Sequence, residues 1–172
     1  MILKIIPIAI SSDIDISITI SATDKMALEG ITLQNLSLHI GSLNYTLNSD
    51  GKSYTVSGMY DRSLKSVFIP DSVTSIGDSA FYRCYNLTSI TIPDGVTSIG
   101  DSVFEWCDDL VSITIPDSVT NIGDDAFSDC SQLNQVNFKG TVRQWQSISK
   151  GSSWNYNVPA TEVICSDGVV SL

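Results

Sequence analysis

Three cysteines that recur every 23 residues, Cys84, Cys107 and Cys130, are the side chains of this chain whose type and spacing could most readily do chemistry. Thiols at regular intervals could bind zinc, form disulfides or pack in a core. A zinc site needs clustered Cys or His ligands, and the chain has neither a C-x-x-C pair nor any histidine besides His39. We therefore expect no metal site and no cofactor.

The regular cysteine spacing predicts a column of small buried side chains. Adjacent coils of a stacked sheet lie roughly 5 Å apart, so a disulfide between neighbours is geometrically conceivable. An odd column leaves one thiol unpaired, however, and packed reduced thiols are the favoured interpretation. A strict period puts the counterpart of Cys130 at Ser153, so Cys165 is not a fourth member of the column.

Two columns of aspartates share the same period and could bind cations. Carboxylates at turns and helix starts also accept hydrogen bonds from their own backbone, and this structural role is the favoured interpretation. Cation binding is the alternative, although no EF-hand spacing supports it. The columns are Asp71, Asp94 and Asp117, and Asp78, Asp101 and Asp124, with Asp108, Asp109, Asp125 and Asp129 nearby.

The many serines are not expected to act as nucleophiles. A nucleophilic serine needs an activating base, and the chain has only one histidine. No glycine-rich phosphate loop follows a predicted strand, and no close pair of carboxylates falls in a predicted cleft. The sequence therefore predicts a protein that is not an enzyme.

Composition and net charge limit the classes of partner that the chain could bind. The chain has 172 residues, 42% hydrophobic and 16% charged, which is enough apolar material for a core. Nineteen acidic against nine basic residues give a net charge of −10, which argues against nucleic acid or anionic membrane as a partner. No apolar run reaches the roughly 18 residues of a membrane-spanning helix. Residues 1–10 lack the features of a signal peptide.

The periodic spacing comes from a 23-residue repeat that occurs three times, beginning at Ile69, Ile92 and Ile115. Such a short, gapless period predicts a solenoid, in which each coil buries its apolar face against the next. Besides those isoleucines and the cysteines and aspartates above, the identical positions are Pro70/Pro93/Pro116, Val73/Val96/Val119, Thr74/Thr97/Thr120, Ile76/Ile99/Ile122, Gly77/Gly100/Gly123, Phe81/Phe104/Phe127 and Leu87/Leu110/Leu133.

The repeated positions predict the elements of each coil. An L-x-x-L-x-L spacing predicts four parallel strands, at residues 64–69, 87–92, 110–115 and 133–138, with a proline turn after each of the first three. Residues 96–99 predict a short second strand. Gly100 is expected to turn left-handed, and Asp101 to cap a helix of one to two turns that ends near Cys107. Phe81, Phe104 and Phe127 should stack as a core spine.

The unit I-P-D-x-V-T-x-I-G-D-x-x-F-x-x-C-x-x-L resembles the leucine-rich repeat of BspA-type surface proteins. The resemblance covers residues 64–138, extends to the tail through Trp145, Trp154 and 163–168, and includes a hairpin at 47–56. It implies a mainly β leucine-rich repeat solenoid of about four coils with short helices, an N-terminal β segment, and a C-terminal cap of one helix and a strand. An asparagine ladder is not expected, because Ser72, Gly95 and Ser118 occupy its position.

We expect four regions: an N-terminal β segment (1–42) that anchors, oligomerises or caps, a hairpin cap (43–63), the repeats (64–138) and a C-terminal cap (139–172). In the N-terminal segment Ile14, Ile16, Ile18 and Ile20 alternate with polar residues, which predicts a half-buried strand. Thr141 is expected to cap a helix through Val142, Trp145 and Ile148. That tryptophan and Trp154 should cover the last coil.

Binding is expected on the outward side chains of the long strands, a neutral hydroxyl and amide surface. These candidate ligand-binding residues are Ser66, Phe68, Ser89, Thr91, Ser112, Thr114, Gln135 and Asn137.

Three functions follow from this reading. The first is a binding or adhesion module that recognises protein or glycan, without nucleic acid or membrane insertion. The second is an appendage of a larger assembly such as a phage particle, anchored or oligomerised through residues 1–42. The third is an intracellular interaction module. The resemblance implies a cell-surface or extracellular location, whereas the expected lack of a signal peptide leaves virion-associated and cytoplasmic locations open.

Overall fold

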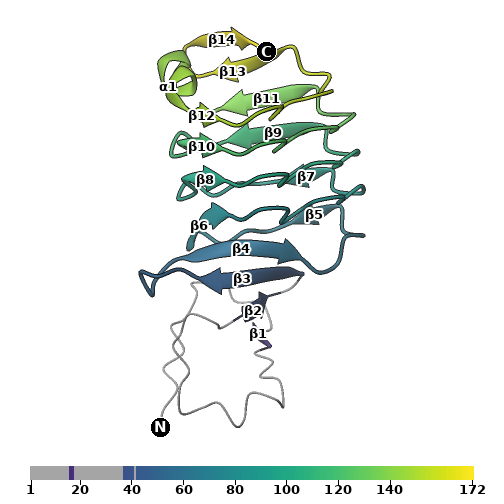
Figure 1. The fold of residues 1–172 in the computed structure, drawn as a ribbon, viewed down its shortest axis with the longest axis vertical. Helices are drawn as coiled ribbons and strands as arrows, with labels where there is room; N and C mark the ends of the chain where they lie inside the picture. The colour runs from purple at the N-terminus through teal and green to yellow at the C-terminus, as the bar shows by residue number, and fades with distance from the viewer. Residues whose placement is uncertain (1–15, 18–36, 41) are drawn as a thin grey trace.

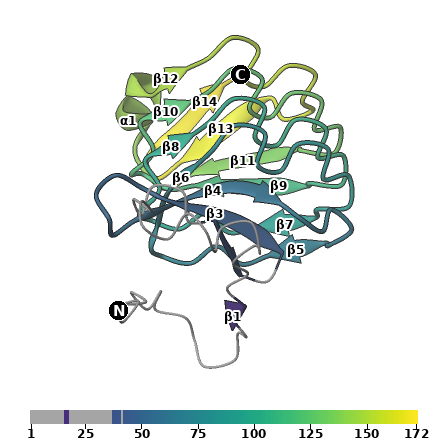
Figure 2. The ribbon, with the colours of Figure 1, turned by 60° about the horizontal axis from the view of Figure 1, so that its bottom comes forward.

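The chain forms a stack of about five coils in the computed structural model, which describes residues 16–17, 37–40 and 42–172 (Figure 1). Figure 2 looks partly along the stack and shows the successive coils lying over one another. The predicted mainly β leucine-rich repeat solenoid is confirmed, and its tail adds one coil to the four expected.

One side of the stack is an eight-stranded sheet. Its strands are β1 (Ile16–Ser17), β2 (Ser37–Ile40), β3 (Leu43–Leu47), β4 (Tyr54–Met59), β6 (Val73–Ile76), β8 (Ser98–Ile99), β10 (Asn121–Ile122) and β12 (Ser149–Lys150), in that order. Strands β1 to β4 pair antiparallel, and β4 to β12 pair parallel. The sheet therefore joins the N-terminal hairpin to the short strands of the coils.

The other side holds the long strands. They are β5 (Ser66–Val67), β7 (Ser89–Ile90), β9 (Ser112–Ile115), β11 (Gln135–Phe138), β13 (Glu162–Cys165) and β14 (Gly168–Ser171). The four predicted strands are present, but they form two sheets: β5 pairs parallel with β7, and β9 pairs parallel with β11, whereas β7 and β9 are in contact without pairing. Strand β13 from the tail adds a fifth strand beside β11. The last strand, β14, turns back antiparallel to β13.

Strands β3 and β4 form the hairpin that the sequence predicts, and β2 pairs with its outer strand, so the hairpin does not end the sheet. Its turn follows β3, with Gly51 at φ +65° and the Asp50 carboxylate accepting hydrogen bonds from the backbone N–H groups of Lys52 and Ser53 at 2.8 and 2.9 Å. These bonds stabilise the ionised form and lower the pKa of Asp50 to about 2. The expected roles of residues 1–42 and the alternation from Ile14 to Ile20 fall mostly outside the described residues.

The segment after each short strand is a turn, so the helix expected up to Cys107 is wrong. Ser102 and Trp106 have φ values of +51° and +61°, which no right-handed helix can contain. The N–H groups instead bond to the next coil: Phe81 donates to the Val103 carbonyl at 2.9 Å. The equivalent bonds in the coils above run from Phe104 to Ala126 and from Phe127 to Trp154, both at 2.8 Å. A stacked neighbour thus takes the bonds that a helix would form internally.

Aromatic rings fill the core behind these turns. The ring of Phe104 lies 5.3 Å from that of Phe81 and 5.1 Å from that of Phe127, with interplanar angles of 1° and 16°. All three side chains are buried. The spine ends against the edge of Trp154, whose ring centre is 6.1 Å from Phe127. The Phe column is therefore a continuous stack through the repeats.

The cysteine column runs beside this spine as buried, free thiols. Two of these thiols donate to a phenylalanine carbonyl one coil below: Cys107 Sγ to Phe81 O at 3.3 Å, and Cys130 Sγ to Phe104 O at 3.0 Å. Burial raises the pKa of Cys130 to about 12 and that of Cys84 to about 11, the latter partly offset by the nearby charge of Arg62. These thiols are packing groups with weak hydrogen bonds.

A helix, α1 (Val142–Ser147), begins the C-terminal cap. Thr141 caps it as predicted, in a capping box with Gln144. Its Trp145 is buried, with its ring centre 5.6 Å from that of Trp154. The helix makes this coil longer than the repeats. The Asp129 N–H donates to the Tyr156 carbonyl, which lies five positions beyond the residue that a strict 23-residue period would place there. The expected placement of Ser153 opposite Cys130 is therefore wrong.

The repeated glycine serves close packing between coils, not the left-handed turn expected at Gly100. Gly51 is the only described glycine with a positive φ. A Cβ on Gly123 would collide with the Asp101 carboxylate and lie 2.5 Å from the Gly100 carbonyl carbon. Coils can therefore approach each other at this corner only without a side chain.

We predict that Gly123→Ala lowers the free energy of unfolding by about 2 kcal/mol, because the added methyl group forces the coils apart at a backbone contact. Chemical denaturation measures the change. Gly58→Ala is the matched control, since its Cβ would meet only the Asn44 Nδ2 at 3.5 Å. Equal stability of the two variants would contradict the close-packing explanation.

We also predict that native protein at pH 8 reacts with iodoacetamide far more slowly than a free thiol does, because burial raises the cysteine pKa values and keeps the thiols protonated. After unfolding without reductant, all four cysteines should be alkylated. Mass spectrometry counts the adducts in both states. Fewer than four adducts on the unfolded chain would show a disulfide and contradict the packed-thiol column.

Candidate functional site

The outward side chains of the long strands lie on the two long-strand sheets. The register pairs Gln135 with Ser112 and Asn137 with Thr114 in the upper sheet, and it pairs Ser66 with Ser89 in the lower one. Of the eight sequence-predicted residues, seven are exposed and Asn137 is half-buried. We call the surface that they form the outer face.

Sequence reasoning missed the upper end of this outer face. Strand β13 continues the outer face with Glu162 and Ile164, because Asn137 pairs with Ile164. Ile164 then pairs with Val169 of β14, and both are exposed, at 40% and 58%. The alternation of exposed and buried residues along β13 was the signal that could have identified these two residues. The outer face therefore ends in an apolar corner, while Phe68 is a second exposed apolar residue at its lower end.

The outer face can form hydrogen bonds but offers little for acid–base chemistry. Hydroxyl and amide groups both donate and accept, and part of this capacity is already used: Gln135 Nε2 donates to Asn137 Oδ1 at 3.0 Å. Among the described residues, no group of three or more His, Cys, Asp or Glu side chains could hold a metal ion. The polar groups of this face are mostly neutral, with the exposed Glu162 on β13 as an exception.

One aspartate column forms a ladder between coils. Asp78 Oδ1 accepts from the Asp101 N–H, and Asp101 Oδ1 accepts from the Asp124 N–H, both at 2.9 Å. Asp124 Oδ1 accepts from the Ser152 N–H at 2.6 Å. The expectation that each carboxylate caps its own helix is therefore wrong, because each one binds the backbone of the coil above. The ladder does structurally what an asparagine ladder does in other repeats.

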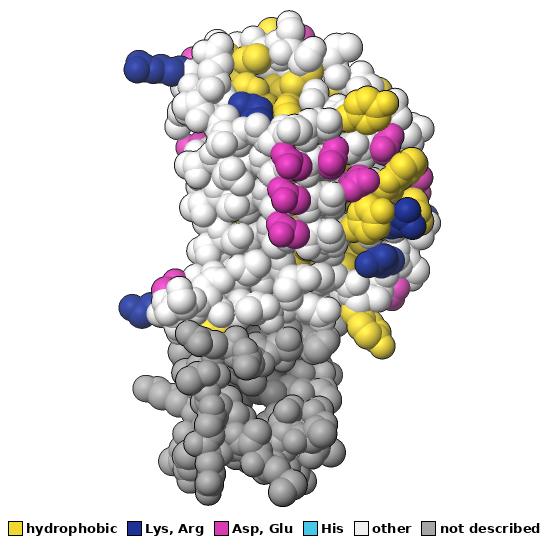
Figure 3. All heavy atoms as spheres, in the orientation of Figure 1, with side chains coloured by type: hydrophobic (Ala, Val, Ile, Leu, Met, Phe, Trp, Pro, Cys, Tyr) yellow, Lys and Arg dark blue, Asp and Glu magenta, His cyan; other side chains and the backbone are white. Residues whose placement is uncertain are grey.

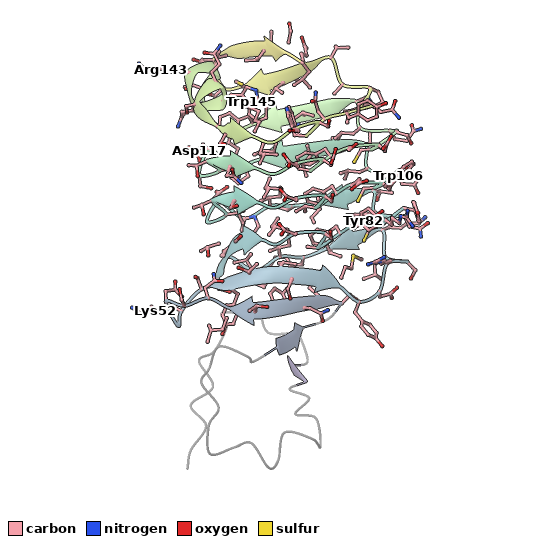
Figure 4. All side chains as sticks on the ribbon, viewed as in Figure 1. Lys52, Tyr82, Trp106, Asp117, Arg143 and Trp145 are labelled. Atoms are coloured by element: carbon pink, nitrogen blue, oxygen red, sulfur yellow. The ribbon has the colours of Figure 1, made fainter. Side chains whose placement is uncertain are left out.

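The other aspartate column, Asp71, Asp94 and Asp117, lies at the exposed corners after the long strands. Lys139 forms an ion pair with Asp94. Both side chains are largely exposed, so the pair contributes at most about 1 kcal/mol. Figure 4 shows Asp117 on the same edge of the stack as Arg143, opposite Tyr82 and Trp106.

That opposite edge carries a surface that sequence reasoning missed. Large side chains project from the turns of successive coils. Backbone hydrogen bonds between the turns hold them in line: Arg83 N–H donates to Glu105 O at 2.9 Å, and Asp109 N–H donates to Tyr85 O at 3.1 Å. We call this surface the turn edge; its residues are Tyr60, Arg62, Tyr82, Arg83, Tyr85, Glu105, Trp106, Asp108, Asp109, Asp129 and Tyr156.

Charge divides the turn edge into two halves. Arg62 and Arg83 lie in the lower coils, where Asp61 precedes Arg62, whereas the four acidic residues of the turn edge lie in the upper coils. Figure 3 shows basic side chains on the right below acidic and hydrophobic ones, with a further acidic group beneath them. Burial, followed by the charges of Asp109 and Asp129, raises the pKa of Asp108. The upper carboxylates therefore crowd one another.

The stacked coils, the L-x-x-L-x-L strands and the neutral outer face define a leucine-rich repeat protein. Within the described part of the chain, no helix is long and apolar enough to cross a membrane. The chain belongs to the family of the BspA type leucine rich repeat region, whose model matches six copies over residues 57–160. The resemblance read from the sequence is thereby confirmed.

Solved structures agree with this assignment. A leucine-rich repeat protein from Bacteroides ovatus is 29% identical with a TM-score of 0.58, over 74% of this chain and 37% of that one. A leucine-rich repeat protein from Bacteroides capillosus is 24% identical with a TM-score of 0.63, over 75% and 97% of the two chains. The T. pallidum leucine rich repeat protein is 22% identical with a TM-score of 0.54, over 71% and 68%.

The last two similarities show the fold alone. This chain spans 37% of the length of the Bacteroides ovatus protein. No curated protein matches the chain.

We predict that Asp101→Ala lowers the free energy of unfolding by about 1 kcal/mol, because the Asp124 N–H loses its acceptor. Asp101→Asn keeps an acceptor oxygen and removes like-charge repulsion, so it should stay within about 0.5 kcal/mol of the parent chain. Thermal unfolding with and without calcium measures both. A calcium-dependent rise in melting temperature that Asp101→Asn abolishes would favour the cation interpretation over the ladder.

Proposed function

We propose that the protein is a non-catalytic recognition module that binds a protein or glycan through the outer face of its long strands. The observation that carries this proposal is the register of the outer face: hydroxyl and amide side chains of neighbouring coils lie opposite one another, Ser66 with Ser89, Ser112 with Gln135 and Thr114 with Asn137. Leucine-rich repeat proteins generally mediate interactions, and the family assignment supports this class of function.

The chemistry of the outer face suits extended polar partners. Seryl, threonyl and amide groups can bond to sugar hydroxyls or to the peptide groups of a partner. Because the central face from Ser89 to Thr114 carries no charge, contact requires no ion to lose its water. Phe68 and Ile164 provide exposed apolar surface at the two ends. An elongated ligand could thus lie along the stack with polar contacts at its centre.

Absence of catalysis belongs to the same proposal. The outer-face serines have neutral register partners, Ser66 with Ser89 and Ser112 with Gln135, so the register places no base beside them to activate a nucleophile. The cysteine column is buried and its thiols are kept protonated. The groups with nucleophilic atoms therefore serve the surface or the packing.

We predict that Thr114→Arg, at the centre of the outer face, weakens ligand binding at least tenfold, because a bulky charge replaces a short hydroxyl beside Asn137. The wild-type chain is first screened on a glycan array and against immobilised mucin, and the variants are then compared on the strongest ligand by biolayer interferometry. Gln146→Arg, an exposed change in α1, is the matched control and should bind as the parent does. Equal binding by Thr114→Arg and the parent would contradict the assignment of the outer face.

A further inference from the structure

We propose that the turn edge is a contact between two copies of this chain, arranged antiparallel so that the basic lower half of each copy faces the acidic upper half of the other. Such a contact is isologous: the same surface serves both partners and the pair closes on itself. This inference is independent of the ligand proposed for the outer face.

The charge pattern of the turn edge is self-complementary only in this arrangement. Arg62 and Arg83 lie in the lower coils, and Glu105, Asp108 and Asp129 lie above them. A parallel pairing would place like charges opposite each other, whereas the antiparallel pairing places each arginine half against a carboxylate half. The chain as a whole carries a charge of −10, so two copies repel unless their contact brings opposite charges together.

The charged groups of the turn edge form no ion pair with other described residues, although Asp129 Oδ1 accepts a hydrogen bond from Asn157 Nδ2 at 2.8 Å. Within the described ranges, the one ion pair is that of Lys139 with Asp94, at another corner of the stack. The guanidinium of Arg83 instead lies over the Tyr82 ring, 5.0 Å from its centre. There it is held at the surface with its fork of N–H groups available to a carboxylate. The lower half also contains Asp61, whose carboxylate already accepts two hydrogen bonds from Ser63.

Aromatic side chains lie between the two charged halves. Tyr85 and Trp106 are 45% and 38% exposed at the centre of the turn edge, and Tyr60 and Tyr156 flank them. Tyrosine, tryptophan and arginine are the residues most enriched in protein interfaces. An apolar centre with charges on both sides is the arrangement expected of an interface that excludes water at its middle.

The backbone gives a second, independent observation. Arg83 and Trp106 adopt left-handed φ values of +58° and +61°, at the position that Asp129 and Asn157 occupy in the coils above. Aspartate and asparagine tolerate this conformation, whereas a bulky residue costs roughly 1 kcal/mol more. Arg83 is exposed and Trp106 is 38% exposed, so packing inside the fold offsets only part of this cost. A contact with another chain would cover the remaining surface of both side chains.

A second copy fits this surface better than other partners do. A cationic peptide would use the acidic half and leave Arg62 and Arg83 facing like charge. A polyanion would be repelled by the upper carboxylates. Only a partner with both signs in the reverse order satisfies the whole surface, and the chain itself is such a partner.

The test uses sedimentation velocity of the full chain at about 150 mM salt, over protein concentrations up to about 100 µM. Wild type should form dimers. An all-acidic edge (Arg62→Glu with Arg83→Glu) and an all-basic edge (Glu105→Arg with Asp129→Arg) should each raise the dissociation constant of the dimer at least tenfold. An equimolar mixture of the two variants should associate within about threefold of wild type, because the edges are then complementary.

The matched control is Lys52→Glu with Arg143→Glu, which changes the net charge as the all-acidic edge does but at sites on the other edge of the stack (Figure 4). It should dimerise as wild type. Trp106→Asn separates association from folding: it should raise the dissociation constant at least tenfold while its melting temperature stays equal or rises. A monomeric wild type would falsify the proposal, and so would a dimer that all edge variants retain, because its contact would lie elsewhere.

Discussion

The close approach of one coil to the next is the constraint on which the rest of this structure depends. Each coil supplies backbone donors and acceptors to its neighbours on three sides: the short strands, the long strands and the turns between them. At the corner that follows each short strand, the aspartate ladder adds side-chain acceptors. These bonds require a spacing that only glycine permits at positions 100 and 123. The Phe and Cys columns then fill the space that this spacing leaves.

Repetition made most of the fold predictable from sequence. An apolar residue that returns every 23 positions must face its own copy in the next coil, so the burial of Phe104 and Cys107 follows from the period alone. The helix expected after Asp101 shows where such reasoning fails. Capping rules describe hydrogen bonds within one segment. They do not take into account that the neighbouring coil offers a carbonyl to every second N–H of the turn. Likewise, α1 breaks the period, so counting by 23 fails in the tail.

The candidate site was only partly predictable for a related reason. Alternation along the long strands was sufficient to identify outward residues such as Thr91 and Thr114, because strand geometry alone decides their direction. The turn edge arises from positions that differ between copies: tyrosine, glutamate and serine occupy one column at residues 82, 105 and 128. Comparing copies for identity discards such positions. Their side chains become a surface only when the turns are stacked.

The hydrogen bonds between coils run in opposite directions on different sides of the stack. Most of the turn N–H groups donate toward the C-terminal end, from Phe81 to Val103 and from Phe104 to Ala126. The glycines after the short strands donate toward the N-terminal end, from Gly100 to Ile76 and from Gly123 to Ile99. The peptide dipoles of the two sides therefore oppose one another, in contrast to those of an α-helix, which add head to tail. A stack of this kind can gain coils without accumulating a macrodipole.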